Sequence, residues 1–233
     1  MINQPIIILV APQMGENIGA AARAMKNFDI SELRIVSPRD GWPNQQARSM
    51  AVGAVNIVDN AKIYYNLESS IEDVEFLYAT SAAARDINKN HILSKELPAD
   101  YPFEHKVAIM FGRENCGLTN AELTYANKII TINTGEFSSL NIAQSIIIIC
   151  YELFNSQIMR VDLANNQKMA TKAELEYFFK HLLTELERKS FFKVTEKKPR
   201  MQQNIMNIFT RIDKLSTSEL QTLRGIVGSL SGK

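Results

Sequence analysis

The chain has few of the residues from which metal centres and disulfide frameworks are built. Its 233 residues include two cysteines, Cys116 and Cys150, and three scattered histidines, His91, His105 and His181. Two cysteines so far apart provide neither a disulfide framework nor the ligand spacing of a zinc site. We therefore expect no bound metal ion, and a reducing cytoplasm is the default location.

Long apolar segments are also lacking. The longest apolar stretch, residues 146–150, is far shorter than the roughly 20 residues that cross a bilayer. The N-terminus has no basic segment, and the apolar run at 6–10 is too short for a secretory signal. We expect neither a membrane anchor nor secretion. The 45% hydrophobic and 22% charged residues are typical of a globular protein, and the length suits one α/β domain with a small appendage.

The common nucleotide-binding motifs are missing as well. Gly15 and Gly19 follow an apolar run, but they match neither the P-loop pattern G-x-x-x-x-G-K-[ST] nor the dinucleotide pattern G-x-G-x-x-G. ATP and NAD are therefore disfavoured as cofactors. Both glycines could equally serve a tight turn and close helix packing.

Charge is distributed unevenly along the chain. Residues 1–158 hold 12 Lys and Arg against 17 Asp and Glu, whereas residues 159–233 hold 14 against 8. The segment 188–200 contains six basic side chains, one acidic residue and two phenylalanines. A basic tail with aromatic residues favours a polyanionic partner such as RNA. A solvated helical face, with the phenylalanines in a core, is the alternative.

Strands and helices alternate along the first two thirds of the chain. Short apolar runs predict strands at 6–10, 33–36, 55–58, 75–79, 107–111 and 128–132. Helical spacing predicts helices at 17–28, 45–51 and 141–154, with a further helix ending near 69–73. This alternation predicts a mostly parallel sheet with helices on both faces.

The segment 141–154 is ambiguous because four consecutive isoleucines favour a strand. We predict a helix, since the segment is long and Ser138 and Ser139 can cap it. It is apolar on more sides than a surface helix requires. Burial in a dimer interface or in a tightly packed core would explain this.

The sequence changes character after residue 158. A polar, aperiodic linker is predicted at 159–170. Capping-box patterns at 171–174 and 216–219 then start amphipathic helices, and apolar residues between them indicate a third helix. We predict an α/β domain at 1–158 and a helical extension at 171–233.

Three short segments carry the functional signal, and each lies between an apolar strand and a helix. They are Asn17-Ile-Gly19-Ala-Ala-Ala-Arg23, Gly112-Arg-Glu114-Asn-Cys-Gly117-Leu118 and Ser139-Leu140-Asn141-Ile-Ala-Gln-Ser145. An arginine among alanines in an apolar helix suggests function. In order and spacing, the three segments resemble the motifs of the SpoU/TrmH branch of the SPOUT RNA methyltransferases. The helical C-terminal part resembles the extension of the TrmJ-type members of this branch.

The resemblance implies an α/β fold with a C-terminal trefoil knot, an exception to the rule that chains avoid threading. It further implies a homodimer that uses S-adenosylmethionine to methylate the ribose 2′-hydroxyl at position 32 of the tRNA anticodon loop. tRNA, and neither DNA nor a membrane, is then the expected partner. Ribose methylation of ribosomal RNA and non-catalytic RNA binding are the alternatives.

Residue roles follow from the same resemblance. Arg23 would activate the hydroxyl, and Asn17 would hold the ribose or the Arg23 side chain. Glu114 would orient its loop or pair with Arg23, and Asn141 would cap and position the last helix of the domain. Because a guanidinium is normally no base, Arg23 would either be transiently neutral or fix a phosphate or hydroxyl for another proton acceptor. The cofactor would be held by three loops that contain Thr80, Ser81, Ala82, Gly112, Ile132, Ser138, Ser139 and Leu140. Ordinary turn and cap chemistry is the alternative for the hydroxyl residues.

Overall fold

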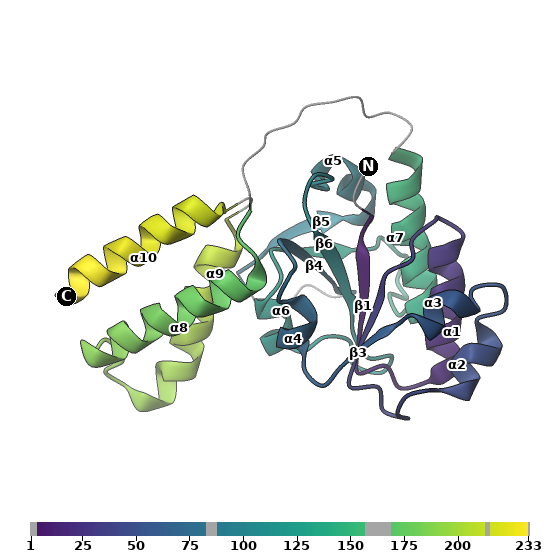
Figure 1. Cartoon of the computed structure of the whole chain (residues 1–233), viewed down its shortest axis with the longest axis horizontal. Helices are drawn as coiled ribbons and strands as arrows, with labels where there is room; N and C mark the ends of the chain where they lie inside the picture. The colour runs from purple at the N-terminus through teal and green to yellow at the C-terminus, as the bar shows by residue number, and fades with distance from the viewer. Residues whose placement is uncertain (1–3, 83–87, 157–168, 213–214, 233) are drawn as a thin grey trace.

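The protein is built on a single parallel sheet (Figure 1). The computed structural model describes residues 4–82, 88–156, 169–212 and 215–232. Its seven strands run in the order β3-β2-β1-β6-β4-β7-β5, and every neighbouring pair is parallel. The strands are β1 (Ile6–Val10), β2 (Leu33–Val36), β3 (Lys62–Tyr64), β4 (Phe76–Thr80), β5 (Asn90–Leu93), β6 (Val107–Phe111) and β7 (Lys128–Thr131). The predicted α/β fold class is confirmed.

The central strands are apolar throughout because helices cover both sides of the sheet. In β1, Ile7 and Leu9 pack into the core on one face, whereas Ile6, Ile8 and Val10 belong to the core on the other face. All five side chains are buried. A parallel strand buried on two faces shows no polar alternation, which explains the uninterrupted apolar run.

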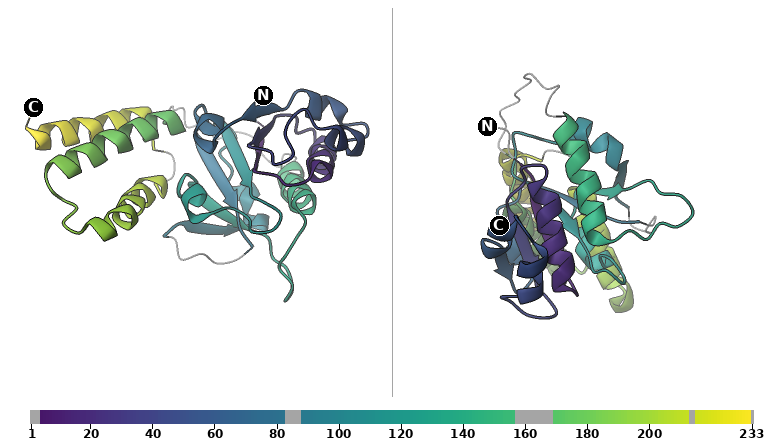
Figure 2. Two further views of the ribbon diagram at one scale, coloured as in Figure 1. Left: turned by 90° about the horizontal axis from the view of Figure 1, so that it is seen from below. Right: turned by 90° about the vertical axis from the view of Figure 1, so that its right-hand side faces the viewer.

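Helices divide unequally between the two faces. The first face is covered by α1 (Gly15–Lys26), α2 (Gln45–Met50), α3 (Val55–Asp59), α5 (Leu97–Asp100) and α7 (Ile142–Ser156). The second face carries α4 (Leu67–Ile71) and α6 (Asn120–Thr124). A short 3₁₀ helix, η1 (Ser94–Glu96), precedes α5. Figures 1 and 2 show α1 and α7 side by side.

Gly15 and Gly19 allow the close packing of α1 on α2. A Cβ at Gly19 would lie 2.3 Å from the carbonyl oxygen of Ala47, and one at Gly15 would lie 2.1 Å from Oδ1 of Asn44. Such distances are far below van der Waals contact. Close helix packing, the alternative offered by the sequence, is what these glycines do.

One predicted strand is wrong and two strands were not predicted. Residues 55–58 belong to helix α3, whose five residues are too few to display a helical period against their β-branched side chains. The unpredicted strands are β3 and β5, short edge strands whose side chains are exposed or half-buried. Their composition lacks the apolar run that marks a central strand.

The C-terminal part contains three helices around a separate apolar cluster. They are α8 (Lys172–Arg188), α9 (Lys198–Thr210) and α10 (Thr217–Ser231), and the 3₁₀ helix η3 (Thr195–Lys197) leads into α9. The predicted capping boxes are present at Thr171 and Ser216. The cluster is centred on Phe178, Phe179 and Leu220. The phenylalanines of 188–200 lie outside this core, since Phe191 is exposed.

The predicted linker falls mostly outside the described residues. Its last two residues, Met169 and Ala170, are buried, and the Ala170 amide donates to the carbonyl of Leu215 at 2.8 Å. Met169 also forms an isolated bridge with Ser216. These two residues at the end of the predicted linker are therefore buried and hydrogen-bonded to the segment that leads into α10.

Two buried lysines join the extension to the sheet domain. Lys89 Nζ donates to the carbonyls of Thr124 at 2.8 Å and Ala126 at 2.7 Å, and also to Oγ1 of Thr210 in α9. Lys172 Nζ, at the start of α8, donates to Oδ1 of Asn127. Burial lowers the pKa of Lys172 to about 7 and, as the main cause, that of Lys89 to about 6.

Candidate functional site

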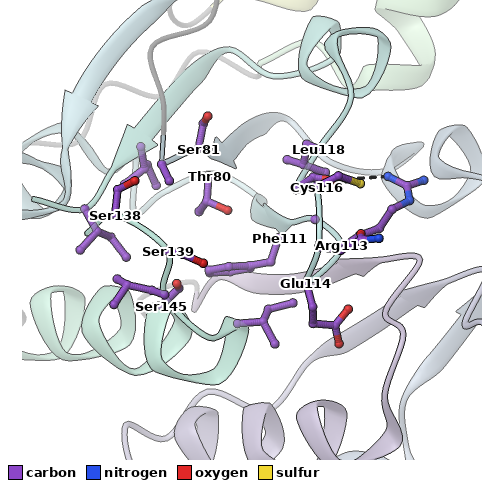
Figure 3. A pocket seen from close by; sticks show the side chains of 18 residues that line it. Thr80, Ser81, Phe111, Arg113, Glu114, Cys116, Leu118, Ser138, Ser139 and Ser145 are labelled. Atoms are coloured by element: carbon purple, nitrogen blue, oxygen red, sulfur yellow. Dashed lines mark hydrogen bonds between the residues drawn. The ribbon is translucent and has the colours of Figure 1, made fainter. Parts of the chain in front are cut away.

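Three loops at the carboxyl ends of β4, β6 and β7 enclose a cavity of about 290 Å³ (Figure 3). Ligands of open parallel sheets bind at this edge of the sheet. All eight residues predicted to hold a cofactor line the cavity: Thr80, Ser81, Ala82, Gly112, Ile132, Ser138, Ser139 and Leu140. Three segments that lie apart along the chain therefore form one continuous site.

The first loop is fixed to the neighbouring strands at its base. The hydroxyl of Thr80 donates to the carbonyl of Met110 at 3.0 Å, and the amide of Ser81 donates to the carbonyl of Ile130 at 3.1 Å. These bonds join the end of β4 to β6 and β7. The Thr80 hydroxyl thus already has an acceptor, and the backbone around it is held at the cavity.

Close backbone approach shapes the second loop. A Cβ at Gly112 would lie 2.2 Å from the carbonyl carbon of Gly117 and 2.3 Å from the amide nitrogen of Leu118. Arg113 and Gly117 exchange backbone hydrogen bonds of 3.3 and 2.9 Å, and Gly117 has a φ of 69°. The loop is consequently a tight hairpin that only glycine permits at position 112.

An ion pair ties this loop to α6. The Arg113 guanidinium donates to both oxygens of Glu122, at 3.0 and 2.9 Å. Burial alone would raise the pKa of Glu122, but the hydrogen bonds from Arg113 and Thr119 outweigh it and lower the pKa. Glu122 also completes the capping box of α6 with Thr119. The loop geometry is therefore anchored on both sides.

The motif side chains meet in a continuous chain of hydrogen bonds. Asn141 Nδ2 donates to Asn17 Oδ1, and Asn17 Nδ2 donates to Glu114 Oε1, each at 2.9 Å. The backbone amide of Gln13 donates to the other oxygen of Glu114 at 2.9 Å. In Figure 3 the Glu114 side chain points toward the purple N-terminal segment. Three of the four residues predicted to be catalytic thus touch one another.

Asn141 has a second contact at the start of α7. Its Oδ1 accepts from the amide of Ala143 at 2.8 Å, so the same side chain caps the helix and reaches Asn17. The Gln13 amide was not predicted as part of the site. A backbone donor cannot be recognised from a side-chain motif, although Gln13 lies only four residues before the first motif.

Arg23 lies apart from this group. Its side chain is exposed on α1, and it does not line the cavity. Among the described residues, no hydrogen bond or ion pair joins Arg23 to Glu114, although the sequence suggested that pairing as one option. A different arginine, Arg39, is close enough for the Glu114 charge to contribute to raising its pKa, after the larger effect of its Asp40 hydrogen bond.

The sequence analysis did not assign half of the cavity wall. Glu114, predicted as catalytic, also lines the cavity, and the unassigned residues lie beside the predicted ones in the same loops or at their flanks: Phe111, Arg113, Asn115, Cys116, Gly117, Leu118, Ile130, Ile142 and Ser145. Their position next to motif residues was the available signal. No group of three potential metal ligands occurs among the residues that the structure describes.

The cavity has the chemistry that S-adenosylmethionine requires. Ile130, Ile132 and Leu140 offer an apolar surface for an adenine ring, and the glycine hairpin exposes backbone groups for close approach. Serine hydroxyls supply hydrogen-bonding groups for the ribose and the amino-acid part. The residues present therefore fit this cofactor.

The fold and the site define a class of protein. The profile of the SpoU rRNA Methylase family matches residues 4–151, and the chain belongs to this family. The cavity walls and the hydrogen-bonded motif residues all lie within the matched part.

Individual relatives have more specific names than the family. The chain is 37% identical over 176 residues to the tRNA (cytidine-2'-O-)-methyltransferase TrmJ of Methanocaldococcus jannaschii, which covers 73% of this chain and 76% of the relative. It is 32% identical to the tRNA (cytidine/uridine-2'-O-)-methyltransferase TrmJ of Pectobacterium atrosepticum, over 99% of this chain and 98% of that protein. The crystal structure of TrmJ from Z. mobilis ZM4 superposes with a TM-score of 0.89 at 35% identity, covering 98% of this chain and 99% of that one.

Proposed function

We propose that this protein transfers a methyl group from S-adenosylmethionine to the ribose 2′-hydroxyl of a pyrimidine at position 32 in the tRNA anticodon loop. The carrying observation is the convergence of all three motifs on one cavity, with Asn141, Asn17 and Glu114 hydrogen-bonded beside it. Relatives named as tRNA 2'-O-methyltransferases match almost the entire chain, including the helical extension.

The bound cofactor supplies a methyl group already activated on a sulfonium, so positioning accounts for much of the acceleration. In the proposed reaction the methyl moves from sulfur to the ribose oxygen, which gives up its proton. The three loops would hold the cofactor, and the glycine hairpin would let it approach the backbone closely. The Glu114 carboxylate has a fixed orientation, because the Asn17 side chain and the Gln13 amide each donate a hydrogen bond to one of its oxygens. These hydrogen bonds keep the three motif segments in fixed positions relative to one another.

Arg23 acts on the substrate in this proposal. A guanidinium is no ordinary base, so Arg23 fixes a phosphate or the 2′-hydroxyl while another group accepts the proton. Its exposure on α1 leaves its guanidinium available for RNA.

In a homodimer, the exposed face formed by α1 and α7 would pack against the second subunit. Ile147, Tyr151 and Phe154 on α7 are 38%, 52% and 38% exposed, an unusual concentration of large apolar side chains beside α1. We propose that this face packs against a second copy.

The division into a methyltransferase domain at 1–158, a linker at 159–170 and an RNA-binding extension at 171–233 belongs to the same proposal. The net charge of +6 in residues 159–233, against −5 before them, supports RNA binding by the extension. A cytoplasmic location fits a tRNA substrate and two cysteines that form no disulfide among the described residues. Among the described residues, no helix combines the length and apolarity needed to cross a membrane.

Ribosomal RNA is the second candidate substrate, because the matched family is described as rRNA methylases. Non-catalytic RNA binding is disfavoured by the presence of Arg23, Asn17 and Asn141 together. The test is nucleoside mass spectrometry on unmodified tRNA incubated with the protein and S-adenosylmethionine. We expect 2′-O-methylcytidine or 2′-O-methyluridine from the anticodon loop. A methylated base would contradict the proposed ribose methylation. Methyl transfer to ribosomal RNA alone would contradict tRNA as the substrate.

A further inference from the structure

A second cavity, of about 390 Å³, lies between the sheet domain and the helical extension. It opens at the carboxyl ends of β1 and β2, and its walls come from α4, α6 and α9. Arg113 lines both cavities, so the two lie on opposite sides of the loop that follows β6. In the sheet order, β1 stands between β2 and β6, so the cavity lies outside the carboxyl ends of neighbouring parallel strands. Ligands of open parallel sheets bind at such a point.

The backbone at this edge is held in a disfavoured conformation. Ala11 and Ser37, directly after β1 and β2, have φ values of 48° and 45°. Side chains with a Cβ rarely adopt this region. The Ala11 amide donates to the carbonyl of Val36 at 2.8 Å, and the Ser37 amide donates to that of Tyr64 at 2.9 Å. Backbone strain of this kind concentrates at ligand sites.

The polar lining is suited to a planar ring with amino hydrogens. Tyr65 is 96% exposed at the cavity, so its ring has a free face. The Tyr125 hydroxyl donates to Glu68 Oε1 at 2.8 Å. Burial, followed by the Glu68 hydrogen bond, raises the pKa of Tyr125, which therefore remains a donor. The second oxygen of Glu68 has no hydrogen bond among the described residues and can accept one from a ligand.

Charge separates two parts of this region. Within the cavity, Arg113 pairs with Glu122 at 2.9 Å, whereas Glu68 has no ion-pair partner among the described residues, and its charge repels a phosphate. The nearby start of α9 is basic, with Arg200 three residues before Gln203, so the two share one face of the helix. Gln203 lines the cavity and supplies an amide. A ligand with a neutral ring inside and a phosphate outside matches this distribution.

We propose that this cavity binds an unstacked RNA base that carries an exocyclic amino group, with cytosine as the best fit. Tyr65 stacks on the ring, Glu68 accepts from the amino group, and Arg200 stays near the phosphate. Carboxylates accept from the N4 amino group of cytosine, whereas uracil presents a carbonyl oxygen at that position. The inference rests on the proposed function in that it requires an RNA substrate, and it assigns recognition of a nucleotide other than the methylated one.

The test measures fluorescence anisotropy of labelled six-nucleotide oligocytidylate and oligouridylate on the full chain, saturated with S-adenosylhomocysteine. We expect about tenfold tighter binding of oligocytidylate. Glu68→Gln should abolish or reverse this preference, because the Gln carbonyl keeps the Tyr125 hydrogen bond and its amino group faces the base as a donor. Tyr65→Ala should weaken both oligomers by a similar factor, since stacking is insensitive to base identity.

Glu72→Gln is the matched control. It removes the same charge at the end of α4, where Glu72 does not line the cavity, and it should preserve the preference for oligocytidylate. Equal binding of the two oligomers, no binding of either, or a preference that survives Glu68→Gln would overturn the inference. These results are separable from the proposed function. tRNA methylation without base preference contradicts only this subsite, and a preference without methyl transfer to any RNA contradicts only the proposed activity.

Discussion

Gly112→Ala is the substitution that most directly tests the architecture of the first cavity. The added Cβ would lie 2.2 Å from the carbonyl carbon of Gly117 and 2.3 Å from the amide nitrogen of Leu118. Ordinary contact begins at 3.4 Å, so the two segments have to separate by about 1 Å. Both obstructing atoms belong to the backbone, and no side-chain rotation can relieve the clash.

The displacement falls on the groups that form the site. It separates the paired backbone of Arg113 and Gly117 and moves Glu114 from its 2.9 Å hydrogen bonds with Asn17 and Gln13. A misplacement of about 1 Å costs roughly 100-fold in rate when positioning drives catalysis. We expect a loss of that order in kcat/KM for methyl transfer, together with weaker cofactor binding.

Calorimetric titration of S-adenosylmethionine and a single-turnover methylation assay measure these two effects. Gly135→Ala is the matched control, since Gly135 lies in the loop between β7 and α7 with nothing within 4 Å of the added Cβ and without a positive φ. It should bind and react like the unaltered protein. If Gly112→Ala does the same while remaining folded, the steric reasoning is refuted.

Two further predictions concern the arginine of the first motif and the seam with the extension. Arg23→Ala should abolish methyl transfer with little change in the calorimetric affinity for S-adenosylmethionine, because Arg23 lies outside the cavity; a near-normal rate would contradict its role. Burial lowers the pKa of Lys172 from its ordinary value of 10.5 to about 7, so between these values the unfolded state binds the proton and the folded state does not. Stability should therefore rise with pH across this window, and thermal unfolding at several pH values should show a smaller rise in Lys172→Met; an unchanged slope would mean that Lys172 is not the cause.

Short stretches of sequence were sufficient to predict the central strands and the starts of the helices. The Ile and Val runs at β1, β6 and β7 mark strands because a parallel strand buried on both faces requires apolar residues throughout. The capping boxes at Thr171 and Ser216 mark helix starts because their hydrogen bonds span only three residues. Helix α7 was separable from a strand by its length, despite four consecutive isoleucines.

Short elements were beyond the reach of these rules. Five residues in α3 and three in β3 show no periodicity that distinguishes helix from strand. Their conformation is set by the neighbours on which they pack. The same limit applies to the site. Motif spacing pointed to Asn17, Glu114 and Asn141, but it could not predict the hydrogen bonds that connect them or the contribution of the Gln13 amide.

The sequence by itself determined the family, the central strands, the three motif loops and the helical nature of the extension, because each depends on residues close together in the chain. Only the tertiary structure decided that Glu114 pairs with Asn17 while Arg23 stays apart, that two buried lysines join the extension to the sheet, and that Glu68 and Gln203 share a second cavity. These contacts join residues many positions apart, and their geometry arises from the packing of whole elements.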